Sequence, residues 1–74
     1  MKKKIFLEHV AKIFEKKKLE ENETFKDLEF DSLIGLDLTT FNDENFSNLN
    51  IKYESIKKCK TIKDLISLYG DEIN

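Results

Sequence analysis

Residues 31–46 read DSLIGLDLTTFNDENF, and this stretch decides the fold class. Asp31 and Ser32 have the short polar side chains that cap the N-terminus of a helix. The apolar residues after them recur at helical spacing: Leu33, Ile34, Leu36, Leu38, Phe41 and Phe46. This pattern predicts a helix of about four turns that begins beside Asp31. The polar side of the helix has no lysine and carries three carboxylates, at Asp37, Asp43 and Glu44.

The segment before this helix contains a second amphipathic pattern. Residues 4–18 predict a first helix, whose apolar face is formed by Phe6, Val10, Ile13 and Phe14. Residues 19–23 contain one apolar side chain and are predicted to form a loop. Thr24 can then cap a short turn that carries Phe25 and Leu28 into the core.

Two shorter helices are predicted downstream. Residues 47–52 are expected to form a loop, and residues 53–59 a short third helix. Thr61 and Asp64 have the spacing of a capping box, in which each side chain bonds the backbone of the other residue. The last helix is therefore expected to begin at Thr61 and to end near Gly70.

Length and composition limit the chain to one small helical domain, residues 1–74. The absence of proline and the presence of only two glycines argue against an all-β fold, because turns need residues with special backbone angles. A single cysteine cannot form an internal disulfide, which favours the reducing cytoplasm. We therefore expect an all-α fold, a small four-helix bundle with a short third helix.

No segment has the pattern of a leader or a membrane anchor. The basic and apolar start of the chain resembles a signal peptide, but Glu8, His9 and Lys12 interrupt the apolar stretch and no cleavage site follows. No run approaches the ~18 apolar residues that a membrane span needs. We therefore expect no membrane partner.

The charge is unevenly distributed along the chain, although the net charge is only −2. Residues 1–18 carry seven lysines and two glutamates, residues 19–55 carry two lysines and ten acids, and residues 56–74 carry four lysines and three acids. The middle of the chain is thus strongly acidic. It is interpreted either as a solvated surface or as a docking surface for basic partners. All 13 basic residues are lysine, so the arginine forks that favour base-edge recognition are missing and no nucleic-acid partner is expected.

The residues offer little from which to build an active site, so we expect a protein that is not an enzyme. His9 is predicted to have a surface or packing role, and Cys59 a buried packing role in the third helix. Asp43 and Glu44 are adjacent on a helix and point in different directions, which disfavours a two-acid hydrolytic site. No glycine-rich phosphate loop and no cluster of metal ligands is present.

Ser32 is the residue with a distinctive chemical position. A phosphate esterified to a serine in the first turn of a helix would be stabilised by free backbone N–H groups and by the helix dipole. Ser32 is thus better suited to carrying a phosphate than to attacking one. The alternative is that Asp31 and Ser32 serve only as helix caps.

Residues 24–33, TFKDLEFDSL, resemble the F-x-[DE]-L-G-x-D-S-L signature of acyl carrier proteins. The resemblance continues in Leu36-Asp37-Leu38, which is similar to the family's V-E-L, and in Phe46, at the aromatic residue that closes the second helix. Residues 61–65, TIKDL, are similar to the T-[VI]-x-D-L opening of the family's last helix. The match spans most of the chain.

The resemblance implies a four-helix bundle of the acyl-carrier-protein type, a non-catalytic carrier with 4′-phosphopantetheine as its cofactor. The group would be attached to Ser32 by a separate phosphopantetheinyl transferase that uses coenzyme A and Mg²⁺. Asp31 and Leu33 flank the attachment site, and Asp31 would help to bind the metal in the transferase complex, with no metal resident in the carrier. The core and any acyl tunnel would be lined by Val10, Ile13, Phe14, Leu36, Phe41, Phe46, Ile56, Ile62 and Leu65.

Further partners implied by the resemblance are acyl-loading and acyl-processing enzymes of fatty-acid, polyketide or specialised biosynthesis. These enzymes would receive acyl or aminoacyl thioesters from a cytoplasmic monomer. The expected partner contacts, besides Leu33, are Ile34, Asp37, Asp43 and Glu44, most of them acidic residues suited to steering basic partners.

Three departures from the family pattern favour a specialised carrier over one of general fatty-acid synthesis. Glu29 stands where the family usually has glycine, so the loop must avoid a positive φ or bear its cost. Ile34 replaces a common acidic residue and is expected to expose an apolar side chain. The third helix is made basic by Lys57, Lys58 and Lys60.

Two other functions are considered beside the carrier. The first is a four-helix interaction module that uses the apolar and acidic face of the second helix without a prosthetic group. The second is a small acyl-transferring enzyme, which is disfavoured because no base lies near any nucleophile in the predicted fold.

Overall fold

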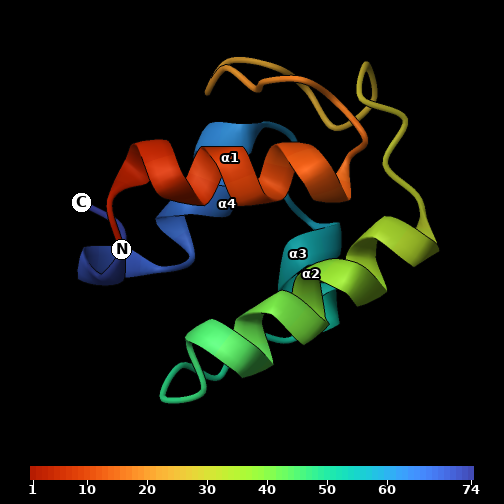
Figure 1. The fold of residues 1–74 in the computed structure, drawn as a ribbon. Helices are drawn as coiled ribbons and strands as arrows, with labels where there is room; N and C mark the ends of the chain where they lie inside the picture. Colours follow the sequence, from red (N-terminus) through yellow and green to blue (C-terminus); the bar gives the residue numbers. More distant parts are fainter.

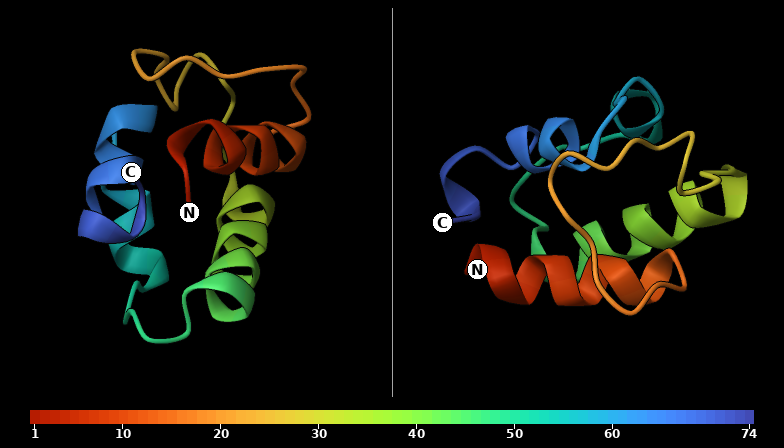
Figure 2. Two further views of the ribbon diagram at one scale, coloured as in Figure 1. Left: turned by 60° about the vertical axis from the view of Figure 1, so that its left-hand side comes forward. Right: turned by 90° about the horizontal axis from the view of Figure 1, so that it is seen from above.

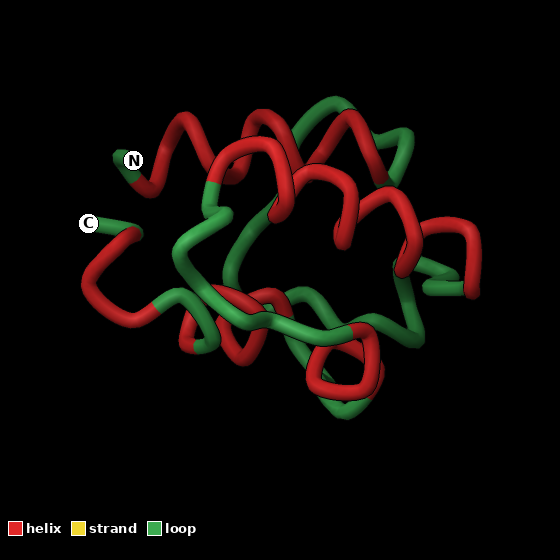
Figure 3. Tube along the Cα trace, turned by 90° about the horizontal axis from the view of Figure 1, so that it is seen from below, coloured by secondary structure: helices red, strands yellow, loops and turns green.

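The computed structural model describes all 74 residues as an all-α domain without strands, as predicted (Figures 1 and 3). Its elements are α1 (Lys3–Ile13), α2 (Ser32–Asn45), α3 (Tyr53–Lys57), α4 (Ile62–Ser67) and a final 3-10 helix, η1 (Gly70–Glu72). None of the helices has the length and hydropathy needed to cross a membrane. The two ends of the chain lie side by side (Figure 2), where Lys3 N–H donates to Asn74 O and Asn74 N–H to Met1 O.

The first helix ends at Ile13, earlier than the predicted residue 18. Glu15 adopts a positive φ of 60°, and Lys16 N–H donates to Ala11 O at 2.8 Å. Together with the bond from Glu15 N–H to Lys12 O (3.1 Å), this is the Schellman pattern that stops a helix and reverses the chain. The reversal lets Leu19, in a segment predicted as loop, return to the core with 5% of its surface exposed.

The short turn predicted after Thr24 is confirmed. Thr24 Oγ1 accepts a hydrogen bond from Asp27 N–H at 3.0 Å, and both Phe25 and Leu28 are buried. These two side chains belong to the core, so their burial fixes the position of the loop that leads into α2.

The same loop is tied to the start of α4 by backbone hydrogen bonds. Phe25 N–H donates to Lys60 O (2.8 Å), Ile62 N–H to Glu23 O (3.0 Å) and Lys63 N–H to Glu21 O (2.9 Å). Each bond joins residues 35 to 42 positions apart in the chain, so they set the tertiary placement of the loop.

The capping box predicted at the start of α4 is present. Thr61 Oγ1 accepts from Asp64 N–H at 3.2 Å, while Asp64 Oδ2 accepts from the backbone N–H groups of Lys60 (3.0 Å) and Thr61 (3.2 Å). These bonds to Lys60 and Thr61 lower the pKa of Asp64 because they stabilise the carboxylate. α4 ends at Ser67 rather than near Gly70, and the chain tightens into η1.

α2 matches its predicted extent, and α3, which ends two residues early, packs against it. Gly35 is buried at this contact, where an added Cβ would overlap the ring of Tyr53. The small residue therefore sets how closely α2 and α3 approach.

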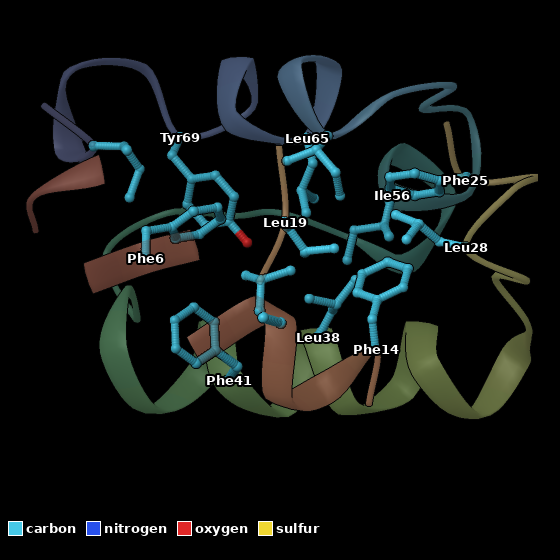
Figure 4. Packing of buried hydrophobic residues seen from close by; sticks show 14 of the residues in the cluster. Phe6, Phe14, Leu19, Phe25, Leu28, Leu38, Phe41, Ile56, Leu65 and Tyr69 are labelled. Carbon is cyan, nitrogen blue, oxygen red and sulfur yellow. The ribbon is translucent and has the colours of Figure 1, made fainter. Parts of the chain in front are cut away.

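The core consists of side chains from all four helices and the loop (Figure 4). The rings of Phe6, Phe41, Phe46 and Tyr69 form one edge-to-face group, with centroids 4.8–6.0 Å apart. Most of the expected core residues are buried, Ile13 only in part. Leu36 is a wrong prediction, because it is 56% exposed on the side of α2 that faces away from the other helices.

One buried polar pair was not predicted. Tyr69 donates its hydroxyl hydrogen to Asn42 Oδ1, and both residues lie in the core. Burial raises the pKa of Tyr69 well above its usual value, so the hydroxyl stays protonated and remains a donor. Asn42 Nδ2 has no hydrogen-bond partner. Loss of the bond from Tyr69 would therefore leave both polar atoms of the buried Asn42 amide without a partner, which destabilises the fold.

We expect Tyr69→Phe to lower the free energy of unfolding by about 1–3 kcal/mol, because Asn42 then loses its remaining partner inside the core. In the double variant Tyr69→Phe/Asn42→Leu, both polar groups are replaced by apolar ones, and most of the loss should be recovered. Urea unfolding of the two variants measures both effects. A double variant less stable than Tyr69→Phe alone would contradict this account.

Candidate functional site

Ser32 is the first residue of α2 and is exposed to solvent. Asp31 is the N-cap, and its Oδ1 accepts a hydrogen bond from Ile34 N–H at 2.9 Å. The cap function predicted for Asp31 is thus confirmed. The Ser32 hydroxyl makes no hydrogen bond within the chain, so it is free to be modified.

The backbone around Ser32 also has free donors. Gly35 N–H donates to Asp31 O and Ile34 N–H to the Asp31 carboxylate, whereas the N–H groups of Ser32 and Leu33 have no acceptor in the chain. These two donors lie at the positive end of a 14-residue helix. The position can therefore hold an anionic group on the serine hydroxyl.

An exposed stripe runs along α2 from the serine. Leu33 is 70% and Leu36 56% exposed, and Asp37 lies beside them on the same side of the helix at a spacing of three and four residues. Asp43 and Glu44, farther along α2, are also exposed. We call Leu33, Leu36, Asp37, Asp43 and Glu44 the α2 stripe.

Ile34 differs from the other predicted contact residues. Its side chain is partly buried and packs against the core, rather than standing exposed beside Ser32. The reason is helical geometry, because Ile34 shares the inward side of α2 with Leu38 and Phe41. Only the solvent-exposed part of the Ile34 side chain can contribute to a partner-binding surface.

Glu29, in the loop before Asp31, has a positive φ of 59°. Phe30 N–H donates to Phe25 O (2.9 Å) and Glu29 N–H to Lys26 O (3.1 Å), which repeats the Schellman pattern seen after α1. The chain thus keeps the left-handed backbone that glycine adopts most readily, and Glu29 bears the steric cost.

The other candidate groups lie away from Ser32 or have structural roles. His9 is exposed on α1, and the centroid of its ring lies 5.6 Å from that of Phe41. It is therefore a surface residue that packs against an aromatic ring. Cys59 is partly buried after α3, and its Sγ lies 3.5 Å from Ser55 O. No group of three or more histidine, cysteine or acidic residues could hold a metal ion.

No cleft opens beside Ser32. The one cleft in the structure lies between α1 and the segment that follows it. Sequence reasoning missed this cleft, because its two walls are brought together only by the chain reversal at Glu15.

No family model, no curated protein and no solved structure matches this chain. The geometry of the chain itself therefore carries the functional argument.

We expect Glu29→Gly to raise the free energy of unfolding by about 1 kcal/mol, because glycine removes the steric cost of the positive φ. Glu15→Gly is a matched variant at an equivalent position and should have a similar effect. Glu8→Gly, in the interior of α1, should instead destabilise the protein by about 1 kcal/mol. The strain assignment fails if urea unfolding shows Glu29→Gly to be as destabilising as Glu8→Gly.

Cys59 is expected to react slowly with alkylating reagents. Burial, with a smaller effect of the Asp64 carboxylate, raises the pKa of the Cys59 thiol from 9.0 to about 11. At pH 8 the folded protein should therefore react with iodoacetamide roughly ten- to a hundredfold more slowly than the urea-unfolded chain, since the thiolate is the nucleophile.

The raised pKa has the matching consequence for stability. The folded state favours the protonated thiol. The contribution of Cys59 to the free energy of unfolding is therefore complete below pH 9.0 and is lost as the pH rises towards about 11. Equal alkylation rates in the folded and unfolded chains would show that Cys59 is not protected.

Proposed function

We propose that this chain is a stand-alone carrier protein of the acyl-carrier-protein type, modified with 4′-phosphopantetheine on Ser32. Acyl or aminoacyl groups would travel as thioesters on this arm between partner enzymes, and the carrier itself would catalyse nothing. One observation carries the proposal: Ser32, the first residue of α2, is exposed and its hydroxyl makes no hydrogen bond within the chain. It directly follows the Asp31 cap. It occurs within the stretch of residues 24–33 that resembles the carrier signature.

The local electrostatics are compatible with a phosphodiester on Ser32. The free N–H groups of Ser32 and Leu33, together with the helix dipole, favour a nearby anion by about 0.3–1 kcal/mol. The Asp31 carboxylate opposes this by a screened repulsion of similar size. The two effects nearly cancel, so the site neither strongly favours nor strongly opposes the charge of the arm. A separate transferase would attach the group, and in its complex Asp31 would be available to a magnesium ion.

The α2 stripe is suited to docking on enzymes that must bind and release the carrier quickly. Leu33 and Leu36 offer a small apolar contact next to the arm, and the three acids continue the stripe away from it. Opposite charges increase the rate of encounter without requiring a large buried interface. Partners of the proposed carrier would thus present a basic surface with an apolar recess.

The order and lengths of the helices also support the carrier fold. A long loop leads from α1 into the serine at the start of α2, and a short α3 precedes α4. Glu29 keeps the left-handed backbone at the position where carriers commonly have glycine. Ile34 provides no acidic contact, which favours a specialised carrier with its own set of partner enzymes, and the single cysteine favours the cytoplasm as its location.

Modification of Ser32 is tested by incubating the purified chain with coenzyme A, Mg²⁺ and a broad-specificity phosphopantetheinyl transferase. We expect the intact mass to increase by one phosphopantetheine. Ser32→Ala should remain unmodified, whereas Ser47→Ala, a matched change at another exposed serine, should be modified normally. Circular dichroism of all three proteins shows whether each is folded.

Absence of a mass gain in the folded protein, beside a known carrier that the same transferase loads, would overturn the carrier proposal. The second candidate, an interaction module without a prosthetic group, would then be favoured. The observation behind it is the exposure of Leu33 and Leu36, which does not depend on modification of Ser32.

A further inference from the structure

A cleft of about 430 Å³ lies along the first half of α1, closed on its other side by residues 17–19. Its polar lining consists of Glu8 and four lysines, which are Lys3, Lys4, Lys17 and Lys18. Leu7 and Leu19 are its two hydrophobic lining residues. The start of α1 and the start of α2 lie at opposite ends of the molecule in Figure 1 and in the right-hand view of Figure 2, and Ser32 is not among the lining residues, so the cleft is separate from Ser32.

The cleft is built by the chain reversal after α1. The positive φ of Glu15 and the bond from Lys16 N–H to Ala11 O turn the chain back along the helix. Leu19 is thereby buried against the core, which anchors the outer wall, and Leu7 is partly buried opposite it. Both walls therefore rest on packed side chains.

The cleft has an excess of positive charge. Its lining contains four lysines and a single acidic residue, Glu8. Lys3 also pairs with Glu21 at 3.2 Å, and Lys18 lies 3.9 Å from Glu20. Lys4 and Lys17 have no ion pair in the structure, so their charges are available to an anion.

The surface of the cleft is largely apolar. The two leucines contribute hydrocarbon, and lysine side chains bury their methylene stems along apolar surface while the ammonium groups reach water. A ligand that fits both features has an anionic head and an aliphatic chain. The volume lies within the ~300–1,000 Å³ typical of small-molecule clefts.

We propose that this cleft binds small amphipathic anions, with a carboxylate or phosphate head between Lys4 and Lys17 and an aliphatic chain over Leu7 and Leu19. Lysine is a point charge without the planar fork of arginine, so it accepts either head group. The concave shape favours a single molecule over a bilayer, because Leu19 is buried and Leu7 partly buried, so neither protrudes as a membrane-inserting side chain would.

The unmodified chain is sufficient for the test, so its result does not depend on the proposed modification of Ser32. The methyl resonances of Leu7 and Leu19 are followed by NMR during titration with octanoate and with octyl phosphate. We expect both probes to shift these methyl signals in a saturable manner. Octanol, inorganic phosphate and octyltrimethylammonium should each bind at least about tenfold more weakly, because each lacks the apolar part or the negative charge.

Charge-reversal variants test the location. Lys4→Glu/Lys17→Glu should weaken octanoate binding about tenfold or more, since two attractive charges become repulsive. Lys57→Glu/Lys58→Glu changes the net charge equally at two exposed lysines on and beside α3, outside the cleft, and should leave the affinity within about twofold. Unfolding midpoints of both variants control for stability.

Three outcomes would overturn the proposal. The first is an absence of saturable shifts with either anion, and the second is equal weakening by the two double variants. The third is binding to vesicles of phosphatidylcholine and phosphatidylglycerol without binding of the soluble anions, which would indicate a membrane-binding surface instead.

Discussion

Backbone hydrogen bonds between residues 21–25 and residues 60–63 hold the rest of the structure in register. They join the long loop that follows α1 to the N-terminus of α4, where the capping box of Thr61 and Asp64 fixes the backbone. The loop is then close enough to the core to bury Phe25 and Leu28. In a chain of 74 residues with no disulfide, such long-range pairing replaces a covalent staple.

The position of Ser32 follows from this arrangement. The turn that buries Phe25 and Leu28 ends at Glu29 with a left-handed backbone, and Asp31 begins α2 immediately afterwards. Burial on one side of α2 leaves the serine on the opposite side, and Leu33 lies beside it there. Contact with a proposed partner at this exposed leucine would remove apolar surface from water, which favours binding.

The uneven charge of the sequence becomes two surfaces of opposite sign in the structure. The α2 stripe is acidic and the cleft along α1 is basic, and each combines its charge with leucines. Their opposite charges imply different ligands. In the proposals made above, the stripe docks basic enzymes beside the Ser32 arm, and the cleft receives small anions independently of that arm.

Local patterns determined much of this protein from the sequence alone. Caps at Asp31 and Thr61 and the spacing of apolar residues depend on neighbours within one or two turns, so the extent of α2 and the start of α4 could be predicted. Tertiary structure decided the rest. Leu36 fits an apolar pattern but faces solvent, Leu19 reaches the core only because the chain reverses at Glu15, and Asn42 meets Tyr69 across 27 residues. The basic cleft likewise needs that reversal, because its walls become neighbours only when residues 17–19 fold back along α1.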